Sequence, residues 1–101
     1  DRVVLVDPDD ILYVQAHGDF ARVVTREGTY EARASLRELG QRLPPHRFLR
    51  GHRSFLVNLD HVCELHPFFS GTMVLRLDDP KRTEIPVSRS AARLLKTILH
   101  L

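Results

Sequence analysis

The chain has 101 residues, of which 43% are hydrophobic and 28% charged, and its formal net charge is +2. This profile fits one folded domain over residues 1–101 with a modest core, and it excludes a disordered chain. No apolar run approaches the roughly 18 residues of a membrane-spanning helix, and no signal peptide is visible at the start.

The first part of the chain is predicted to form antiparallel hairpins. A short apolar run, Val3 to Val6, ends in a carboxylate-rich turn at residues 7–10. Three segments after it are rich in β-branched and aromatic residues, and we expect a strand in each: residues 11–16, 20–25 and 29–33. Tight connections at residues 17–19 and 26–28 allow these strands to pair as hairpins.

A short helix is predicted next. Ser35 and Glu38 have the spacing of a capping box, in which each side chain bonds to the backbone of the other residue. Leucines then recur at helical spacing as far as Pro44 and Pro45, which do not continue a helix. We therefore expect an amphipathic helix over residues 36–43.

The rest of the chain returns to strands and closes with a second helix. Strands are expected over four segments: residues 55–57, 61–65, 72–77 and 83–87. Turns are expected at residues 67–71 and 78–81. Ser88 is the expected N-cap of the final helix, whose apolar residues between Ala91 and Leu99 form a stripe that should face the core.

The order of these elements predicts the fold class. Hairpin turns favour antiparallel pairing, and no βαβ alternation supports a parallel sheet. The expected class is mainly β (α+β minor), with small antiparallel sheets, one short internal helix and a C-terminal helix. Because the chain lacks an initiating Met, we also expect it to be a piece of a longer protein.

Two further features are expected to be structural. Cys63 is the only cysteine and cannot form an internal disulfide, which fits a reducing compartment such as the cytoplasm. Val62 and Leu65 flank it, so we expect a buried thiol rather than a reactive one. Phe68 and Phe69 are expected to pack in the core or at a sheet edge.

Charge is unevenly distributed along the chain. Residues 1–30 carry a net charge of −3, residues 31–58 carry +4, residues 59–87 carry −2 and residues 88–101 carry +3. Thirteen of the 15 cationic residues are arginine, whose planar guanidinium suits bidentate contacts to phosphate and guanine. A GC-rich genome explains that enrichment equally well, so the positions of the arginines must decide.

Four polar side chains crowd into five residues just before the strand that starts at Phe55: Arg50, His52, Arg53 and Ser54. A cluster of this density suits a surface that binds a polyanion, whereas a catalytic site draws its groups from distant segments. Alternate residues of a strand face opposite sides. All four side chains can therefore serve one surface only if a loop extends through His52, which Gly51 permits.

The same cluster has a purely structural interpretation. Arg50 or Arg53 could form a salt bridge with Glu31 or Glu38, and His52 could be an internal histidine whose hydrogen bonds are satisfied. Sequence spacing alone leaves both interpretations open.

Two other places are candidate binding sites. Ser88 and Arg89 open the last helix, and a helix N-terminus attracts anions. Arg89 opposes the helix dipole there, which favours an external anionic partner over a local role. The tip at residues 17–20 projects His17 and Phe20 around a glycine, although a plain turn explains the same residues.

Metal binding and catalysis find little support. The six histidines lie at positions 17, 46, 52, 61, 66 and 100, with no pair at the spacing of known zinc motifs, and Cys63 is a solitary thiol. The serines lack a nucleophile-elbow setting, and no glycine-rich phosphate loop occurs. We therefore expect no metal, no cofactor and no enzyme activity.

Three segments together resemble the LytTR DNA-binding domain of bacterial transcription regulators: residues 11–20 (ILYVQAHGDF), 48–58 (FLRGHRSFLVN) and 85–89 (IPVSR). The resemblance extends over roughly residues 3–99, and the second and third segments are specific in combination. It implies a mostly β fold without a helix-turn-helix, in which loops enter successive major grooves of DNA.

The resemblance also implies which residues meet DNA. The contact positions of the family fall on the early hairpin tip at or beside Phe20, on Arg53 next to His52, and on Arg89 after Ser88. The tip of family members more often carries Asn-Tyr where this chain has Asp19-Phe20, and His17 is then the alternative contact.

The expected function is sequence-specific binding of double-stranded DNA. Arg53 and Arg89 would read guanine edges, while the phosphates would be held by the remaining polar residues of these sites: Arg50, His52, Ser54 and Ser88. Arg47 and the last helix, with Arg93 and Lys96, would add non-specific attraction.

The expected partners follow from the same resemblance. Family members usually bind two direct-repeat half-sites as dimers, with an upstream sensor or receiver domain, so this chain would be the C-terminal part of such a regulator. The alternative is a β-rich protein-interaction module whose arginine clusters bind an acidic partner, with residues 66–69 as a binding knob. RNA binding is a third interpretation, but it favours more exposed aromatic residues than this chain has.

Overall fold

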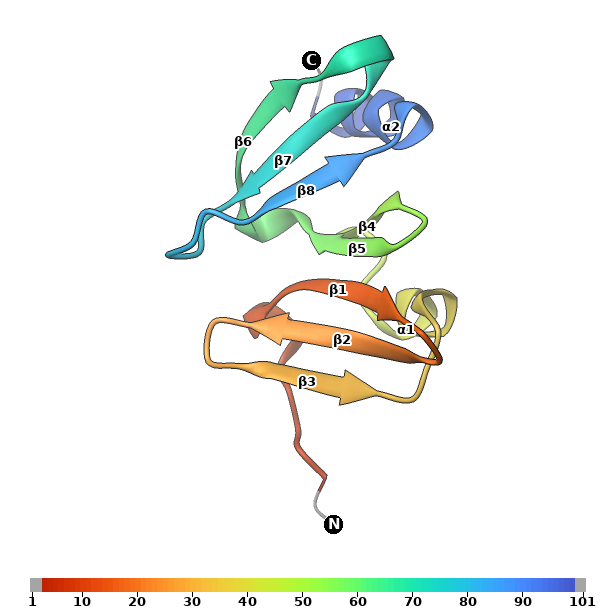
Figure 1. Cartoon of the computed structure of the whole chain (residues 1–101), viewed down its shortest axis with the longest axis vertical. Coiled ribbons are helices and arrows are strands. Elements are labelled where there is room, and N and C mark those ends of the chain that lie inside the picture. Colours follow the sequence, from red (N-terminus) through yellow and green to blue (C-terminus); the bar gives the residue numbers. More distant parts are fainter. Residues whose placement is uncertain (1–2, 100–101) are drawn as a thin grey trace.

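The structure, a computed structural model, describes residues 3–99 and has the expected mainly β fold in this range (Figure 1). Five strands form one antiparallel sheet in the order β3-β2-β1-β5-β4: β1 (Ile11–His17), β2 (Phe20–Thr25), β3 (Thr29–Ala32), β4 (Phe48–His52) and β5 (Phe55–Asn58). Three strands form a second antiparallel sheet: β6 (Val62–Pro67), β7 (Met73–Leu77) and β8 (Glu84–Val87).

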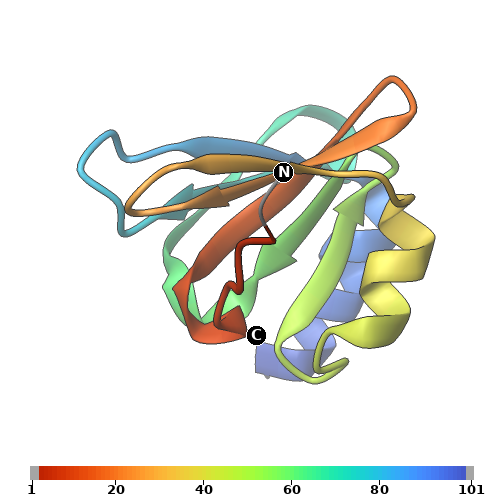
Figure 2. The same ribbon diagram turned by 90° about the horizontal axis from the view of Figure 1, so that it is seen from below.

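Two α-helices accompany the sheets, and both lie on the same side of the molecule (Figures 1 and 2). The first, α1 (Leu36–Arg42), begins at the expected capping box, because Ser35 Oγ accepts from the Glu38 amide and Glu38 accepts from the Ser35 amide. The second, α2 (Arg89–Leu99), closes the described chain. No helix among the described residues is long and apolar enough to cross a bilayer.

Strands of the five-stranded sheet carry buried side chains on both faces, which produces two hydrophobic clusters. One face packs with α1, and Val14, Leu36 and Leu56 lie in this cluster. The other face packs with the second sheet and α2, and Val57 and Leu75 lie in that cluster. Leu56 and Val57 are neighbours in β5, so the strand alternation sends one side chain into each cluster.

Strand β4 was not expected from the sequence, and it corrects the prediction of a loop through His52. Residues 48–52 pair with β5, with Leu49 opposite Val57 and His52 opposite Phe55, and the register shifts in between. Arg, Gly and His are not among the residues enriched in strands, but a buried partner strand supplies the hydrogen bonds. Only Arg53 and Ser54 remain as the turn.

Three predictions of burial are wrong. Cys63 is exposed on β6, an edge strand, where Arg82 Nη1 lies 3.2 Å from its Sγ. Phe68 and Phe69 are 61% and 67% exposed, and their rings contact each other with centroids 4.8 Å apart. The apolar stripe of α2 is buried only in part, because its outer members remain largely exposed: Leu94, Ile98 and Leu99.

Candidate nucleic-acid interface

The β1–β2 hairpin turns in two residues and presents the first candidate site. Its register places His17 opposite Phe20, with Gly18 and Asp19 between them. Gly18 has φ +60°, a conformation that residues with a side chain rarely adopt. His17 is exposed and Phe20 half-buried. The Arg33 guanidinium lies over the Phe20 ring, 5.0 Å from the centroid.

The β4–β5 hairpin presents the second site, and its turn is braced from within. Arg50 Nε donates to the His52 carbonyl (3.2 Å), and Arg50 Nη2 donates to the Arg53 carbonyl (2.7 Å). His52 Nδ1 accepts from the Ser54 amide (3.1 Å), and its ring meets the Phe55 ring edge to face. Arg50 and His52 therefore shape the turn, while the Arg53 side chain remains exposed.

The start of α2 presents the third site. Ser88 Oγ accepts from the Ala91 amide (3.3 Å), so Ser88 caps the helix as expected. Arg89 is the first helical residue, and its side chain is exposed. A methyl group at Gly71 would lie 3.4 Å from Arg89 Cγ, so the turn that carries Phe69 packs against this arginine.

Backbone hydrogen bonds join the three sites into one surface, which we call the tip ridge (His17–Phe20, Arg53–Ser54 and Ser88–Arg89). The Ala16 amide donates to the Ser54 carbonyl (2.9 Å) and connects the two hairpin tips. The Ser88 amide donates to the Gly51 carbonyl (2.8 Å) and connects the second hairpin to α2. All three sites lie along the right-hand side of Figure 1.

The arginines of the tip ridge carry uncompensated charge. Within residues 3–99, carboxylates form salt bridges with Arg26, Arg42, Arg47 and Arg76, and neither Arg53 nor Arg89 is among these arginines. The structural interpretation of the cluster, a pairing of Arg50 or Arg53 with Glu31 or Glu38, is therefore not realised.

Arg47 corrects another expectation. It was predicted to attract DNA non-specifically, but it lies at the opposite end of the β4–β5 hairpin, between Asp9 and Asp60 (Nε–Oδ2 2.9 Å to Asp60). The hydrogen bond to Asp9, together with that to Asp60, raises the pKa of Arg47. Arg26 and Asp78 form a second pair at this end (2.6 Å). Neutralised charges thus gather away from the tip ridge.

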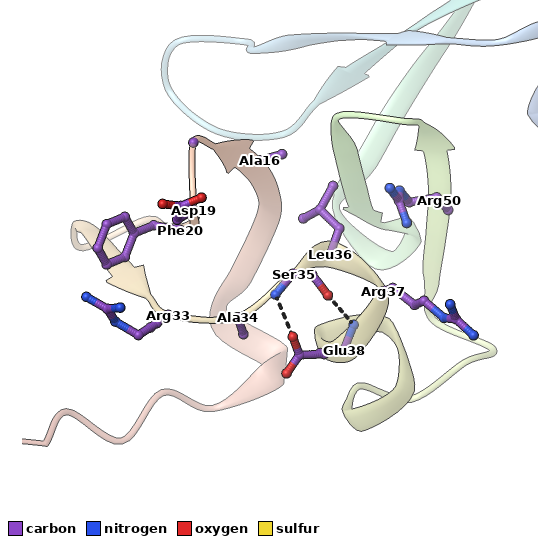
Figure 3. Close-up of a pocket in the computed structure, with 11 residues that line it drawn as sticks. Ala16, Asp19, Phe20, Arg33, Ala34, Ser35, Leu36, Arg37, Glu38 and Arg50 are labelled. Atoms are coloured by element: carbon purple, nitrogen blue, oxygen red, sulfur yellow. Dashed lines mark hydrogen bonds between the residues drawn. The ribbon is translucent and has the colours of Figure 1, made fainter.

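Two arginines near the first hairpin were not singled out by the sequence. Arg33 and Arg37 line a hollow of about 510 Å³ between the β1–β2 tip and the start of α1, and Arg50 lines it from β4 (Figure 3). The +4 charge of residues 31–58 was the available signal, but it did not separate these arginines from Arg42 or Arg47.

Metal ligands do not gather anywhere in the described range. No three His, Cys, Asp or Glu side chains of residues 3–99 come close enough to hold an ion. His100 lies outside the described residues.

Comparisons with known proteins agree with one another. A family model described as LytTr DNA-binding domain matches residues 1–100. The transcriptional regulatory protein YpdB of Escherichia coli K12 is 39% identical over 101 residues, which are 100% of this chain and 41% of YpdB. The sensory transduction protein LytT of Bacillus subtilis is 36% identical over 101 residues, with the same two shares.

A solved structure also matches. It is the LytTr DNA-binding domain of a methyl-accepting/DNA response regulator from Bacillus cereus, with a TM-score of 0.85 and 31% sequence identity. The match covers 95% of this chain and 86% of that one. The chain spans about two fifths of the length of the curated relatives named above.

Proposed function

Because this chain belongs to the LytTr DNA-binding domain family of transcriptional regulators, we propose that its tip ridge binds double-stranded DNA sequence-specifically. The observation that carries the proposal is the juxtaposition of Arg53 and Arg89. Both are exposed, neither forms a salt bridge with a described carboxylate, and hydrogen bonds hold their backbones in one surface. An arginine fork in the major groove binds guanine O6 and N7.

The roles of the tip ridge and of Arg50 and His52, which brace its second turn, follow from how each side chain is held. Arg53 and Arg89 are not engaged elsewhere, so each reads a guanine, worth about 1–3 kcal/mol of discrimination. Phosphate contacts fix the register, and they come from the more constrained groups: Arg50, His52, Ser54 and Ser88. His17 and Phe20 contact DNA from the first hairpin.

The order of the three sites supports contacts in successive grooves. The β1–β2 tip, the β4–β5 turn and the start of α2 follow one another along the longest axis of the molecule, which is vertical in Figure 1. Loops at separate heights of the ridge can meet different parts of one face of the duplex without a recognition helix.

The wider setting is also part of the proposal. The chain spans 41% of YpdB and of LytT. We place it as the C-terminal output domain of a longer bacterial regulator with an upstream sensor or receiver domain, bound as a dimer to direct-repeat half-sites. A bacterial regulator that binds chromosomal DNA would be located in the cytoplasm.

The test begins with selection of a bound site from a random duplex pool. Gel-shift titrations then compare the selected site with a scrambled duplex. Arg53→Ala and Arg89→Ala should lose about 1–3 kcal/mol on the selected site and much less on the scrambled one, because they lose base contacts. Arg50→Ala should weaken both duplexes alike. Wild-type affinity for the selected site in both the Arg53 and Arg89 variants would refute the assignment.

A second function has one observation in its favour. Phe68 and Phe69 expose an aromatic pair, and such a pair suits the binding knob of a protein-interaction module. This alternative predicts that wild type does not discriminate between duplexes. It also predicts that the arginine variants and a Phe68→Ala/Phe69→Ala variant lose an acidic protein partner in a pull-down.

A further inference from the structure

The hollow beside the first hairpin is distinct from the tip ridge although it borders on it. Its walls come from the β1–β2 tip, from the connection between β3 and α1, and from β4 (Figure 3). Three arginines line it: Arg33 from the connection between β3 and α1, Arg37 from α1 and Arg50 from β4. None of them forms a salt bridge with a carboxylate of the described residues, although other arginines of the chain do.

Arg33 is held in place by an aromatic ring instead of an acid. Its guanidinium lies 5.0 Å from the centroid of the Phe20 ring, and Figure 3 shows the two side chains facing each other. Stacking on a ring restrains a guanidinium through its face and leaves the N–H donors at its edge available. A restrained fork with available donors is suited to bidentate contact with phosphate.

Arg37 and Arg50 lie on the side of the hollow away from Arg33, and their guanidinium groups point in different directions (Figure 3). Two backbone carbonyls hold Arg50, so its position is fixed while its charge is not neutralised. Arg37 is exposed in the first turn of α1, where a cation opposes the helix dipole. Local structure therefore gives Arg37 no favourable partner, and an external anion would supply one.

Two carboxylates also line the hollow, and they do not cancel this charge. Glu38 accepts a hydrogen bond from the Ser35 amide in the capping box, and its Oε2 lies 3.9 Å from Arg42 Nη2. Both partners of this carboxylate therefore belong to α1 or its N-cap. Asp19 is exposed at the hairpin tip. The lining therefore carries three positive and two negative charges, and one of the negative charges, that of Glu38, is already bonded to α1.

We propose that this hollow is a phosphate clamp, in which Arg33 and Arg37 hold phosphodiester groups of the DNA strand that flanks the site read by the tip ridge. The inference rests on the proposed function and extends it to residues outside the tip ridge. The ligand class is the DNA backbone, so the clamp adds affinity and register without sequence preference.

The experiment measures how binding of the selected duplex depends on salt. Each phosphate contact that is lost lowers the magnitude of the slope of log K against log salt by about 0.9. Arg33→Ala and Arg37→Ala should each produce that change, the double variant about twice as much, and the preference for the selected over the scrambled duplex should stay at the wild-type ratio. Arg33→Lys should retain part of the contact, because lysine keeps the charge but not the fork.

Arg42→Ala is the matched control. It removes the same charge from the same helix, but Arg42 pairs with Glu38 and does not line the hollow. Its slope should remain that of wild type. Thermal melts of all variants verify that they fold.

Trimming the duplex from each end in turn locates the clamp. Wild type should lose affinity when one particular flank is removed. The Arg33→Ala/Arg37→Ala variant should bind the full duplex and the duplex without that flank equally well. Equal slopes for Arg42→Ala and the double variant would overturn the clamp and leave the proposed function standing. Failure of wild type to prefer any duplex would overturn both.

Discussion

Asn58 is fully buried although its side chain is polar, and all its hydrogen bonds are to backbone atoms. Nδ2 donates to the carbonyl of Ile11 (2.9 Å) and lies 3.4 Å from that of Pro8, while Oδ1 accepts from the amide of Asp60 (3.0 Å). It ties the end of β5 to the start of β1. These are the two strands whose pairing brings the hairpin tips together.

Replacing Asn58 with Leu should therefore destabilise the fold. The change leaves the Ile11 carbonyl and the Asp60 amide without their partner, and an unsatisfied buried group costs about 1–3 kcal/mol. Urea denaturation measures the loss in the free energy of unfolding. Gln41→Ala, at an exposed amide on α1, is the control and should stay within about 0.5 kcal/mol of wild type. An Asn58 variant as stable as that control would contradict this role.

Asp79 couples the stability of the β7–β8 turn to pH. Burial alone would raise the pKa of this carboxyl group. Hydrogen bonds from the Thr83 hydroxyl (2.5 Å) and the Thr83 amide (2.8 Å) outweigh burial, so the pKa lies below its ordinary value of 3.8. A lowered carboxyl pKa stabilises the fold above the ordinary value, and that contribution is lost as the pH falls through the folded-state pKa.

Asp79→Asn should remove this contribution. Wild type should exceed the variant in free energy of unfolding most at neutral pH, and the difference should shrink as the pH falls below about 3.8, where the unfolded chain begins to bind the proton. Denaturation curves at a series of pH values measure it. Thr83→Val removes only the hydroxyl donor and should show an intermediate dependence. A difference that grows on acidification would show that the sign is wrong.

Single residues also mark where sequence reasoning failed. Cys63, Phe68 and Phe69 were expected to be buried or packed, but burial depends on whether a second layer covers the strand. The edge strand β6 has no neighbour on one side, and the turn after it extends into solvent. Composition does not reveal which strand will lie at an edge.

At the scale of elements, the helices and hairpins could be predicted because their signals are local. The capping box at Ser35 and the cap at Ser88 are both present. Strand β4 could not be predicted, because Arg50-Gly51-His52 favours a loop and only pairing with β5 makes it a strand. Tertiary hydrogen bonds here outweigh local propensity.

The candidate site shows the same division. The sequence predicted all three parts of the tip ridge, because a dense group of arginines and a helix cap are recognised from neighbouring residues alone. The pairing of β1 with β5 is not, since more than thirty residues separate these strands. Arg33 and Arg37 were missed for this reason: they join Arg50 only where distant segments meet around the hollow.

At the scale of the whole molecule, the two hydrophobic clusters should unfold as one unit. They share strands of the central sheet, because β5 places Leu56 in one cluster and Val57 in the other. If the side chains of one cluster separate, one face of the central sheet becomes exposed, and the strands of that sheet also hold the other cluster. Cooperative unfolding is the usual behaviour of single domains of this size.

Leu56→Ala and Leu75→Ala test this coupling, because they truncate buried side chains of different clusters. Each should cost about 2–5 kcal/mol. Tyrosine fluorescence and far-UV circular dichroism should report coincident transitions for both variants and for wild type. Leu94→Ala, at an exposed position, should change little. Two separate transitions in either core variant would mean that the sheets fold independently.

The brevity of the two hairpin turns has a consequence for how a partner is met. Only two residues in each turn are outside the strand pairing. In the β4–β5 turn, Arg50 also donates hydrogen bonds to two backbone carbonyls. The backbone of these turns therefore loses little conformational entropy on binding, whereas for a flexible loop that loss is a large free-energy cost. Encounter with a polyanion would then be governed by electrostatic approach and docking angle, not by slow ordering of the protein.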